Sequence, residues 1–181
     1  MNKFEIKRGT NISHWLSQSD ARGAERRKYF TCDDMKRLAD WGFDHIRIPV
    51  DEVQMWDESG RQDNESFDLM DSAINWALED GMKAVVDLHI LRSHFFNQAK
   101  EPELFTDPAK AAKFAEFWRQ LSRRLGTRSN GQVAYELMNE PVAANSQDWN
   151  RVAMLALKAN REKESDRTII LGSNRWNSVT T

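Results

Sequence analysis

Short apolar stretches alternate along the chain with longer stretches in which apolar residues recur every three or four positions. The short stretches are rich in β-branched and aliphatic residues and end at turn residues, which predicts strands, whereas the longer ones predict amphipathic helices. One strand–helix pair takes roughly 35–50 residues, more than the roughly 30 of a minimal βαβ unit. The predicted strands are Phe4–Asn11, Phe43–Val50, Lys83–Ile90, Gln132–Asn139 and Thr168–Ser173.

Helix signals lie between these strands. Thr31 and Asp34 resemble a capping box at the start of one helix. Asp107 followed by Pro108 is an N-cap with proline at the first helical position, and Ser146 is placed to cap a last helix. The apolar stripes are Met35, Leu38 and Ala39; Phe67, Met70, Ile74, Ala77 and Leu78; Phe114, Phe117, Trp118, Leu121 and Leu125; and Trp149, Val152, Ala153, Ala156 and Ala159.

This alternation predicts an α/β fold with a parallel sheet and right-handed crossovers. The strands are not apolar throughout: Arg47 lies between Ile46 and Ile48, and Asp87 and Glu136 interrupt later strands in the same way. Because side chains alternate between faces, each strand presents an apolar face to the helices and a partly polar face to the other side. A polar face suits the inside of a barrel with an active site at the carboxyl-end rim. A single polar edge strand facing water is the alternative.

The composition narrows the class of protein. With 181 residues, 26 Lys and Arg, 28 Asp and Glu and a net charge of -2, the chain lacks the charge that favours nucleic acid or an anionic membrane as a partner. No apolar run approaches the roughly 20 residues of a spanning helix. A single cysteine, Cys32, excludes an internal disulfide and a cysteine-based metal cluster, and no cofactor is implied. The first residues lack the apolar core of a secretory signal, which fits a cytoplasmic protein or a secreted one whose signal has been removed.

Tryptophan is frequent, with 7 Trp and 9 Phe but only 2 Tyr. A surplus of indoles serves either core packing or flat apolar platforms for sugar rings. Helical spacing predicts core positions for Trp41, Trp76 and Trp118. The candidates for a sugar face are Trp15, Trp56, Trp149 and Trp176, of which Trp149 also fits a packing role.

The strongest single feature is the stretch Leu137–Pro141 (LMNEP) at the end of the fourth strand. Proline removes a ladder donor and ends the strand, so Glu140 is expected at its tip. A carboxyl group there beside the amide of Asn139 suits general acid catalysis on a polyhydroxylated substrate. The alternative is a turn in which both side chains only bond the local backbone.

Motifs on five predicted strands resemble, in order, the strand ends of glycoside hydrolase family 5, the cellulase-type retaining glycosidases. They are Phe4–Gln18 (FEIKRGTNISHWLSQ), His45–Pro49 (HIRIP), Val85–His89 (VVDLH), Ala134–Val142 (AYELMNEPV) and Leu171–Ser178 (LGSNRWNS). The resemblance implies a (β/α)₈ TIM barrel, of which this chain would be the first five units, residues 1–181 forming one catalytic-domain fragment. A complete barrel takes about 250 residues.

The resemblance also implies roles for individual residues. Glu140 would be the general acid/base, and Asn139 would bond the 2-hydroxyl of the sugar being cleaved. Arg47 would hold the nucleophile in its charged form, and His89 would line the same subsite. Substrate-binding positions would be His14, Trp15, His94 and Trp176.

A retaining glycosidase needs a second carboxylate, which in this family is a Glu on strand seven. No acidic residue of this chain is placed to substitute for it. Asp87 and Glu136 are expected below the rim, paired with Arg47 or His45. We therefore expect the amino-terminal part of a longer enzyme, inactive by itself.

Three functions remain open at this point. The first is a retaining hydrolase of a β-linked polysaccharide such as a β-glucan, with a polysaccharide or oligosaccharide as its partner. The second is a non-catalytic carbohydrate-binding barrel fragment. The third is a barrel amidohydrolase that would use His89, His94 and Asp87 as metal ligands, although its usual pair of strand-one histidines is missing.

Overall fold

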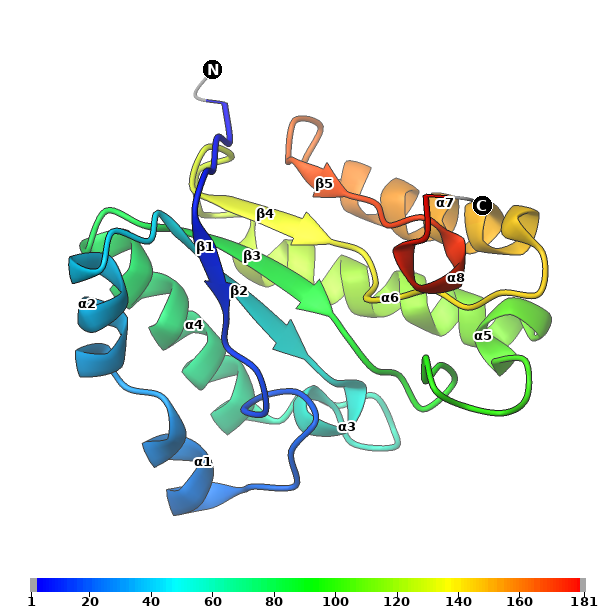
Figure 1. Ribbon diagram of the computed structural model, residues 1–181. Coiled ribbons are helices and arrows are strands. Elements are labelled where there is room, and N and C mark those ends of the chain that lie inside the picture. Colours follow the sequence, from blue (N-terminus) through cyan, green and yellow to red (C-terminus); the bar gives the residue numbers. More distant parts are fainter. Residues whose placement is uncertain (1–2, 180–181) are drawn as a thin grey trace.

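The computed structural model describes residues 3–179, and over that range the strands follow one another across one sheet in chain order (Figure 1). They are β1 (Gly9–Asn11), β2 (His45–Val50), β3 (Lys83–Leu88), β4 (Val133–Glu136) and β5 (Ile169–Ile170). Every neighbouring pair is parallel, as the sequence predicts. The carboxyl ends of all the strands therefore meet at the same edge of the sheet.

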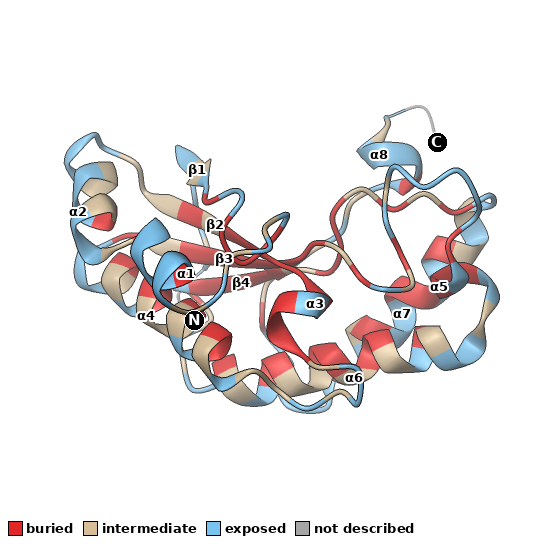
Figure 2. Cartoon of the chain, turned by 90° about the horizontal axis from the view of Figure 1, so that it is seen from below, coloured by how far each residue is buried: buried red, intermediate tan, exposed pale blue. Residues whose placement is uncertain are grey.

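The long helices connect successive strands and pack on one side of the sheet. They are α2 (Cys32–Asp40), α4 (Asn64–Glu79), α6 (Pro108–Leu125) and α7 (Ser146–Arg161). Short helices lie in the connections: α1 (Gly23–Tyr29), α3 (Glu52–Met55), α5 (Glu103–Thr106) and α8 (Asn174–Asn177). Figure 2 shows burial concentrated in the strands and on the helix faces turned toward them. None of the helices within residues 3–179 has the length and apolarity needed to cross a membrane.

The predicted apolar stripes form the interface between helices and sheet. Phe67 of α4 and Phe114 and Trp118 of α6 are at most 1% exposed. Trp56 joins them, with its ring centroid 5.3 Å from that of Phe67 and 4.3 Å from that of Phe117. Burying a side chain of this size stabilises the fold by about 1.5–3 kcal/mol, so this interface fixes the sheet from which the polar side chains project.

Two of the three predicted helix starts are confirmed. Thr31 and Asp34 form a capping box, in which Asp34 accepts from the backbone nitrogen of Thr31 at 3.0 Å. The carboxylate of Asp107 caps α6, which has proline in its first turn. The cap of α7 is Asn145 rather than Ser146, because the Asn145 amide oxygen reaches the backbone two residues further on.

β1 begins at Gly9 instead of Phe4, and a side chain explains the difference. The carboxylate of Asp44 accepts from the backbone nitrogens of Lys7 at 2.8 Å and Arg8 at 3.0 Å. These nitrogens are thereby satisfied by a side chain rather than by a strand, so no ladder forms there.

β4 and β5 also end earlier than the sequence predicts. Just after each of these two strands, a tryptophan indole from a covering helix donates a hydrogen bond to a backbone carbonyl. Trp118 donates to Leu137 at 3.0 Å, and Trp149 donates to Gly172 at 2.9 Å. The segments past β4 and β5 are thus fixed by helix side chains, which leaves their own side chains free to turn toward the rim.

The core prediction for tryptophans is confirmed for Trp118 and wrong for Trp41. Trp41 is 71% exposed because it is the C-cap residue of α2 and lies past the apolar stripe of that helix. Trp76 is partly buried and packs against the core.

A polar cluster lies at the amino end of β5, away from the carboxyl-end rim of the sheet. Glu164 accepts from Ser122 at 2.7 Å, from Tyr135 at 2.8 Å and from Arg167 at 2.6 Å. Arg167 is only 1% exposed and also donates to the carbonyl of Val133. The cluster closes the amino-terminal edge of the sheet, so the Glu164 carboxylate is committed to the fold.

Candidate active site

Arg47 is the centre of the polar face of the sheet. From β2 its Nε and Nη2 donate to the two carboxylate oxygens of Glu136 at 2.7 and 2.9 Å, and Nη1 donates to Asn11 at 2.9 Å. Nη2 also lies 2.7 Å from Asp87 Oδ2 and 3.1 Å from Asn139 Oδ1. Burial lowers the pKa of Arg47, but the bond to Glu136 and the charges of Asp87, Glu136 and Glu140 outweigh it and raise that pKa overall. One guanidinium therefore joins β1, β3, β4 and the segment after β4.

The predicted pairing of Asp87 and Glu136 with Arg47 is confirmed. His45, the alternative partner, instead bonds Asp44 at 2.7 Å. The carboxyl group of Asp87 is fully buried, and burial raises its pKa to about 6, against the lowering effects of His89 and Arg47. It therefore remains an ion-pair partner at neutral pH.

His89 stands one step nearer the carboxyl edge, just after β3. Its Nδ1 lies 2.7 Å from Asp87 Oδ2, and its Nε2 lies 2.8 Å from the side-chain nitrogen of Gln18. The ring is 7% exposed and meets Phe96 edge-on at 5.8 Å. The resemblance placed His89 beside Arg47 and Asn139, and the contacts through Asp87 bring these residues together.

Glu140 does not lie within β4, which ends at Glu136, but in the turn that follows it. Its φ of 43° is left-handed, a conformation that non-glycine residues hold mainly at functional sites. The side chain is partly buried. Within residues 3–179 the Glu140 carboxylate has no hydrogen bond or ion pair, whereas the neighbouring Asn139 is fixed by Arg47. The alternative of a turn that only bonds local backbone is therefore not what the structure has.

The four predicted substrate-binding residues divide into two pairs. His14 is exposed at a φ of 58°, and Trp176 is 56% exposed, with its Nε1 donating to the Phe96 carbonyl at 2.9 Å. Trp15 is 1% exposed and donates to the carbonyl of Arg26, so it is a core residue. His94 is also fully buried, which removes it from direct contact with a substrate.

Two further tryptophans proposed as sugar platforms are corrected for the same reason. Trp56 is 1% exposed and Trp149 is 3% exposed, and both donate their Nε1 to groups inside the fold. Sequence position did not separate these indoles from Trp176: Trp149 lies in the first turns of α7 and Trp56 at the end of α3, and both pack into the core between helices and sheet.

A cavity of about 460 Å³ lies next to residues 142–144, the segment that follows Pro141, and Glu140 itself is not part of its wall. The segments after β3, β4 and β5 line it, with Trp176 and Arg175 on one side and Phe96 and Lys100 on another. Both Arg175 and Trp176 have left-handed backbones. The exposed indole, aromatic ring and polar rim together resemble the lining of sites for small polar molecules.

The sequence reading missed Asn11, Gln18 and Asp51. Asp51 directly follows the last residue of β2, at the carboxyl edge of the sheet where the polar residues gather, and this position was its signal. Asn11 and Gln18 lie in the first motif stretch, but nothing in their spacing indicated contacts to Arg47 and His89. Within residues 3–179 no three His, Cys, Asp or Glu side chains are grouped so as to hold a metal ion.

Five parallel β/α units, with their polar groups converging at the carboxyl edge, define a protein of the (β/α)₈-barrel class. A family model described as "Cellulase (glycosyl hydrolase family 5)" matches residues 8–181. The chain belongs to this family.

Individual relatives agree with that assignment. Endoglucanase C of Acetivibrio thermocellus is 31% identical over 176 residues, covering 96% of this chain and 51% of that protein. Cellodextrinase A of Ruminococcus flavefaciens is 28% identical, covering 97% and 53%. The structure of endoglucanase Cel5A from Thermotoga maritima superposes with a TM-score of 0.77 at 25% identity, over 96% of this chain and 53% of that one. The chain spans about half the length of the relatives it matches.

Proposed function

We propose that this chain supplies the acid/base half of a retaining glycoside hydrolase acting on a β-linked glucan. The observation that carries the proposal is the Glu140 carboxyl group, which is partly buried and unbonded among residues 3–179, next to an Asn139 oriented by Arg47. The relatives named endoglucanase and cellodextrinase, and the Thermotoga maritima Cel5A complex with cellobiose, support a glucan as the substrate.

In this reaction Glu140 gives its proton to the oxygen between two sugars as the bond from that oxygen to the anomeric carbon breaks. A second carboxylate attacks the anomeric carbon and forms a covalent bond to it. Glu140, now ionised, then removes a proton from the water that releases the sugar. The two carboxyl groups need to be roughly 5–5.5 Å apart. Asp87 and Glu136 are tied to Arg47 and are poor candidates for the second group.

Asn139 and Trp176 are proposed to hold the sugars. The oxygen of the Asn139 amide is taken by Arg47, so its NH₂ group is the part that faces a sugar hydroxyl. The exposed Trp176 indole offers a flat apolar surface beside the 460 Å³ cavity. Sugar C–H groups stack on such a surface while their hydroxyls need the polar rim.

The test is Glu140→Gln in the full-length protein, assayed on a soluble β-glucan and on an aryl glycoside with an activated leaving group. General acid assistance is typically worth about 10²–10⁴-fold, so glucan turnover falls by that factor. Bond cleavage in the aryl glycoside falls much less because its leaving group needs no proton. Glu79→Gln, at the exposed end of α4, is the matched control. Full glucan activity in Glu140→Gln removes Glu140 from this role, and glucan binding without any turnover in the wild type favours the carbohydrate-binding alternative.

A further inference from the structure

Gln18 lies in the connection after β1, on the side of the strand carboxyl ends. Its φ of 52° is left-handed, which costs a non-glycine residue conformational energy unless its surroundings compensate. Asp51 supplies the compensation, because its Oδ2 accepts from the Gln18 backbone nitrogen at 2.6 Å. Burial raises the pKa of Asp51, and the bond from Gln18 opposes that rise. The backbone of Gln18 is therefore fixed beside the ends of β2 and β3.

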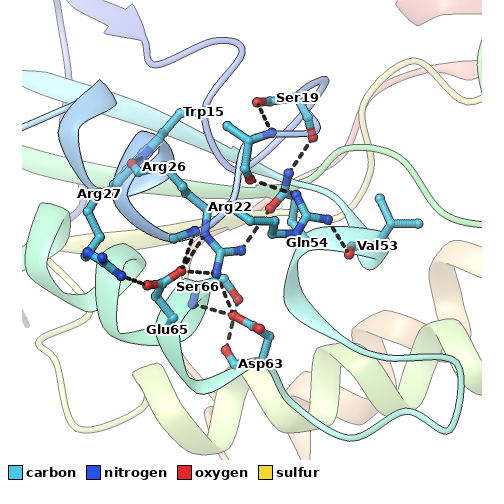
Figure 3. Close-up of polar contacts among 12 residues, drawn as sticks. Trp15, Ser19, Arg22, Arg26, Arg27, Val53, Gln54, Asp63, Glu65 and Ser66 are labelled. Carbon is cyan, nitrogen blue, oxygen red and sulfur yellow. Dashed lines mark hydrogen bonds and ion pairs between the residues drawn. The ribbon is translucent and has the colours of Figure 1, made fainter.

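The next residue is anchored as well, by a chain of contacts that reaches the core (Figure 3). The carbonyl of Ser19 accepts from Gln54 Nε2, and Gln54 Oε1 accepts from Arg26 at 3.0 Å. Arg26 is 1% exposed and pairs with Asp63 at 2.9 Å. A segment without regular secondary structure is thus held rigidly enough to place one side chain.

The side chain so placed is the Gln18 amide, whose nitrogen lies 2.8 Å from His89 Nε2. At the other end of the ring, His89 Nδ1 lies 2.7 Å from Asp87 Oδ2. That oxygen is also 2.7 Å from Arg47 Nη2, which keeps Asp87 ionised and makes it an acceptor. Nδ1 must then carry the hydrogen, and in a neutral imidazole Nε2 is left with a lone pair.

We propose that Gln18 is a positioning residue: its amide NH₂ donates to His89 Nε2 and holds the ring in one orientation as the neutral Nδ1–H tautomer. The inference rests on the proposed function in so far as His89 lines the reaction site. With its nitrogen so used, the exposed Gln18 amide presents its oxygen to solvent, so this corner of the site offers an acceptor to a sugar hydroxyl.

The charged groups around His89 come from several elements. Asp87 on β3 and Asp51 after β2 are acidic and Arg47 on β2 is basic, and all of them interact with His89 directly or through Asp87. His94, in the connection after β3, is uncharged at neutral pH because burial lowers its pKa to about 4. Glu136 on β4 acts on Asp87 and is bonded to Arg47. Of these groups Asp87 contacts Nδ1, whereas the neutral Gln18 amide is the group in contact with Nε2.

The experiment is nitrogen NMR of the imidazole rings in the labelled chain, which has 4 His, at pH 8, above the reference imidazole value of about 6.5. In the wild type, His89 Nδ1 resonates in the pyrrole-type range and Nε2 in the pyridine-type range, with a scalar coupling across the bond to the Gln18 amide nitrogen. In Gln18→Asn, which tolerates the left-handed backbone but is one methylene shorter, the coupling is lost. In Gln18→Glu, which only accepts, Nε2 moves by most of the pyridine-to-pyrrole difference.

Gln147→Glu, in the first turn of α7, is the charge-matched control and leaves the His89 signals unchanged. A pyrrole-type Nε2 in the wild type overturns the proposal, because the Gln18 oxygen would then face the ring. A Gln18→Glu spectrum identical to the wild type overturns it equally. Neither of these NMR outcomes depends on enzymatic activity. A wild-type spectrum as expected in a full-length protein that hydrolyses no glycoside contradicts the proposed function alone.

Discussion

The imidazole of His94 lies edge-on against the ring of Phe105, with centroids 5.6 Å apart and planes at 84°. His94 is fully buried, and neither of its ring nitrogens has a hydrogen-bond partner within residues 3–179. A buried polar atom without a partner costs about 1–3 kcal/mol. The connection after β3, which also carries Phe96, therefore packs around an imidazole whose burial favours the uncharged form of the ring.

The first prediction concerns acid stability. Burial lowers the pKa of His94 to about 4, whereas the reference value for an unfolded chain is about 6.5. Because the unfolded state binds this proton first, the His94 contribution to the free energy of unfolding falls as pH drops from about 6.5 to about 4, while the raised pKa of Asp87 contributes in the opposite direction below about pH 6. The difference of about 2.5 units corresponds to roughly 3 kcal/mol. Urea unfolding of the wild type and of His94→Phe at a series of pH values measures it, because the stability difference between the two shifts in favour of the variant by this amount as pH falls through that window.

Replacing the two unpartnered ring nitrogens of His94 also affects the free energy of unfolding at neutral pH. His94→Phe keeps an aromatic ring of similar size and is expected to raise the free energy of unfolding by about 1 kcal/mol or leave it unchanged. His94→Ala opens a cavity and lowers it by about 2–4 kcal/mol. A strongly destabilised His94→Phe would show that the ring nitrogens bond ordered water.

Two arginine–glutamate pairs allow the contribution of a buried ion pair to the free energy of unfolding to be compared with that of an exposed one. Glu164 accepts from the fully buried Arg167, so Glu164→Gln is expected to cost about 3–5 kcal/mol of unfolding free energy. The matched substitution Glu162→Gln removes an exposed partner of Arg119, where solvent screens the pair, and changes the unfolding free energy far less. Equal losses in the two variants would contradict the assignment of Glu164 to a closed cluster.

Arg47→Lys tests whether the fork of the guanidinium matters beyond its charge. A lysine keeps the positive charge but loses the paired bonds to Glu136 and the reach to Asn11 and Asn139. The variant is expected to lose about 2–4 kcal/mol in urea unfolding because buried groups lose their partners. Stability within about 0.5 kcal/mol of the wild type would contradict the central role given to Arg47.

Two tryptophans that the sequence grouped together are expected to behave oppositely. Trp15→Ala empties a core position and costs about 3–5 kcal/mol of stability. Trp176→Ala removes an exposed ring and leaves stability nearly unchanged, but weakens binding of a cello-oligosaccharide about tenfold, equivalent to about 1.4 kcal/mol. Urea unfolding and calorimetric titration of each variant give the two numbers. Unchanged binding in Trp176→Ala rejects its assignment as a sugar platform.

The order and direction of the strands were predictable because alternation of short apolar and long amphipathic stretches leaves few topologies. The pairing of Arg47 with Asp87 and Glu136 was predictable too, since period-2 alternation puts these side chains on one face. The left-handed turn at Glu140 was not, because a residue that precedes proline favours an extended backbone.

The tryptophans and the loops escaped prediction for a different reason. Whether Trp15 faces a sugar or the carbonyl of Arg26 depends on how the connection after β1 folds back, which is fixed by tertiary contacts through Gln54 and Asp51. Neither contact leaves a periodic pattern. The role of Gln18 is hidden in the same way, because its partner His89 lies 71 positions away in the chain.

Within residues 3–179 the bonds that Arg47 makes end before α7 begins, on β1, β3, β4 and Asn139. This confines the crossover points that a recombination library between family members can use. A junction near Asn145 transfers the whole set of matched partners from one parent, whereas one between β2 and β3 pairs the arginine of one parent with the acids of another. Chimeras joined at the first position should survive at a much higher frequency, even where the parents differ at most other positions.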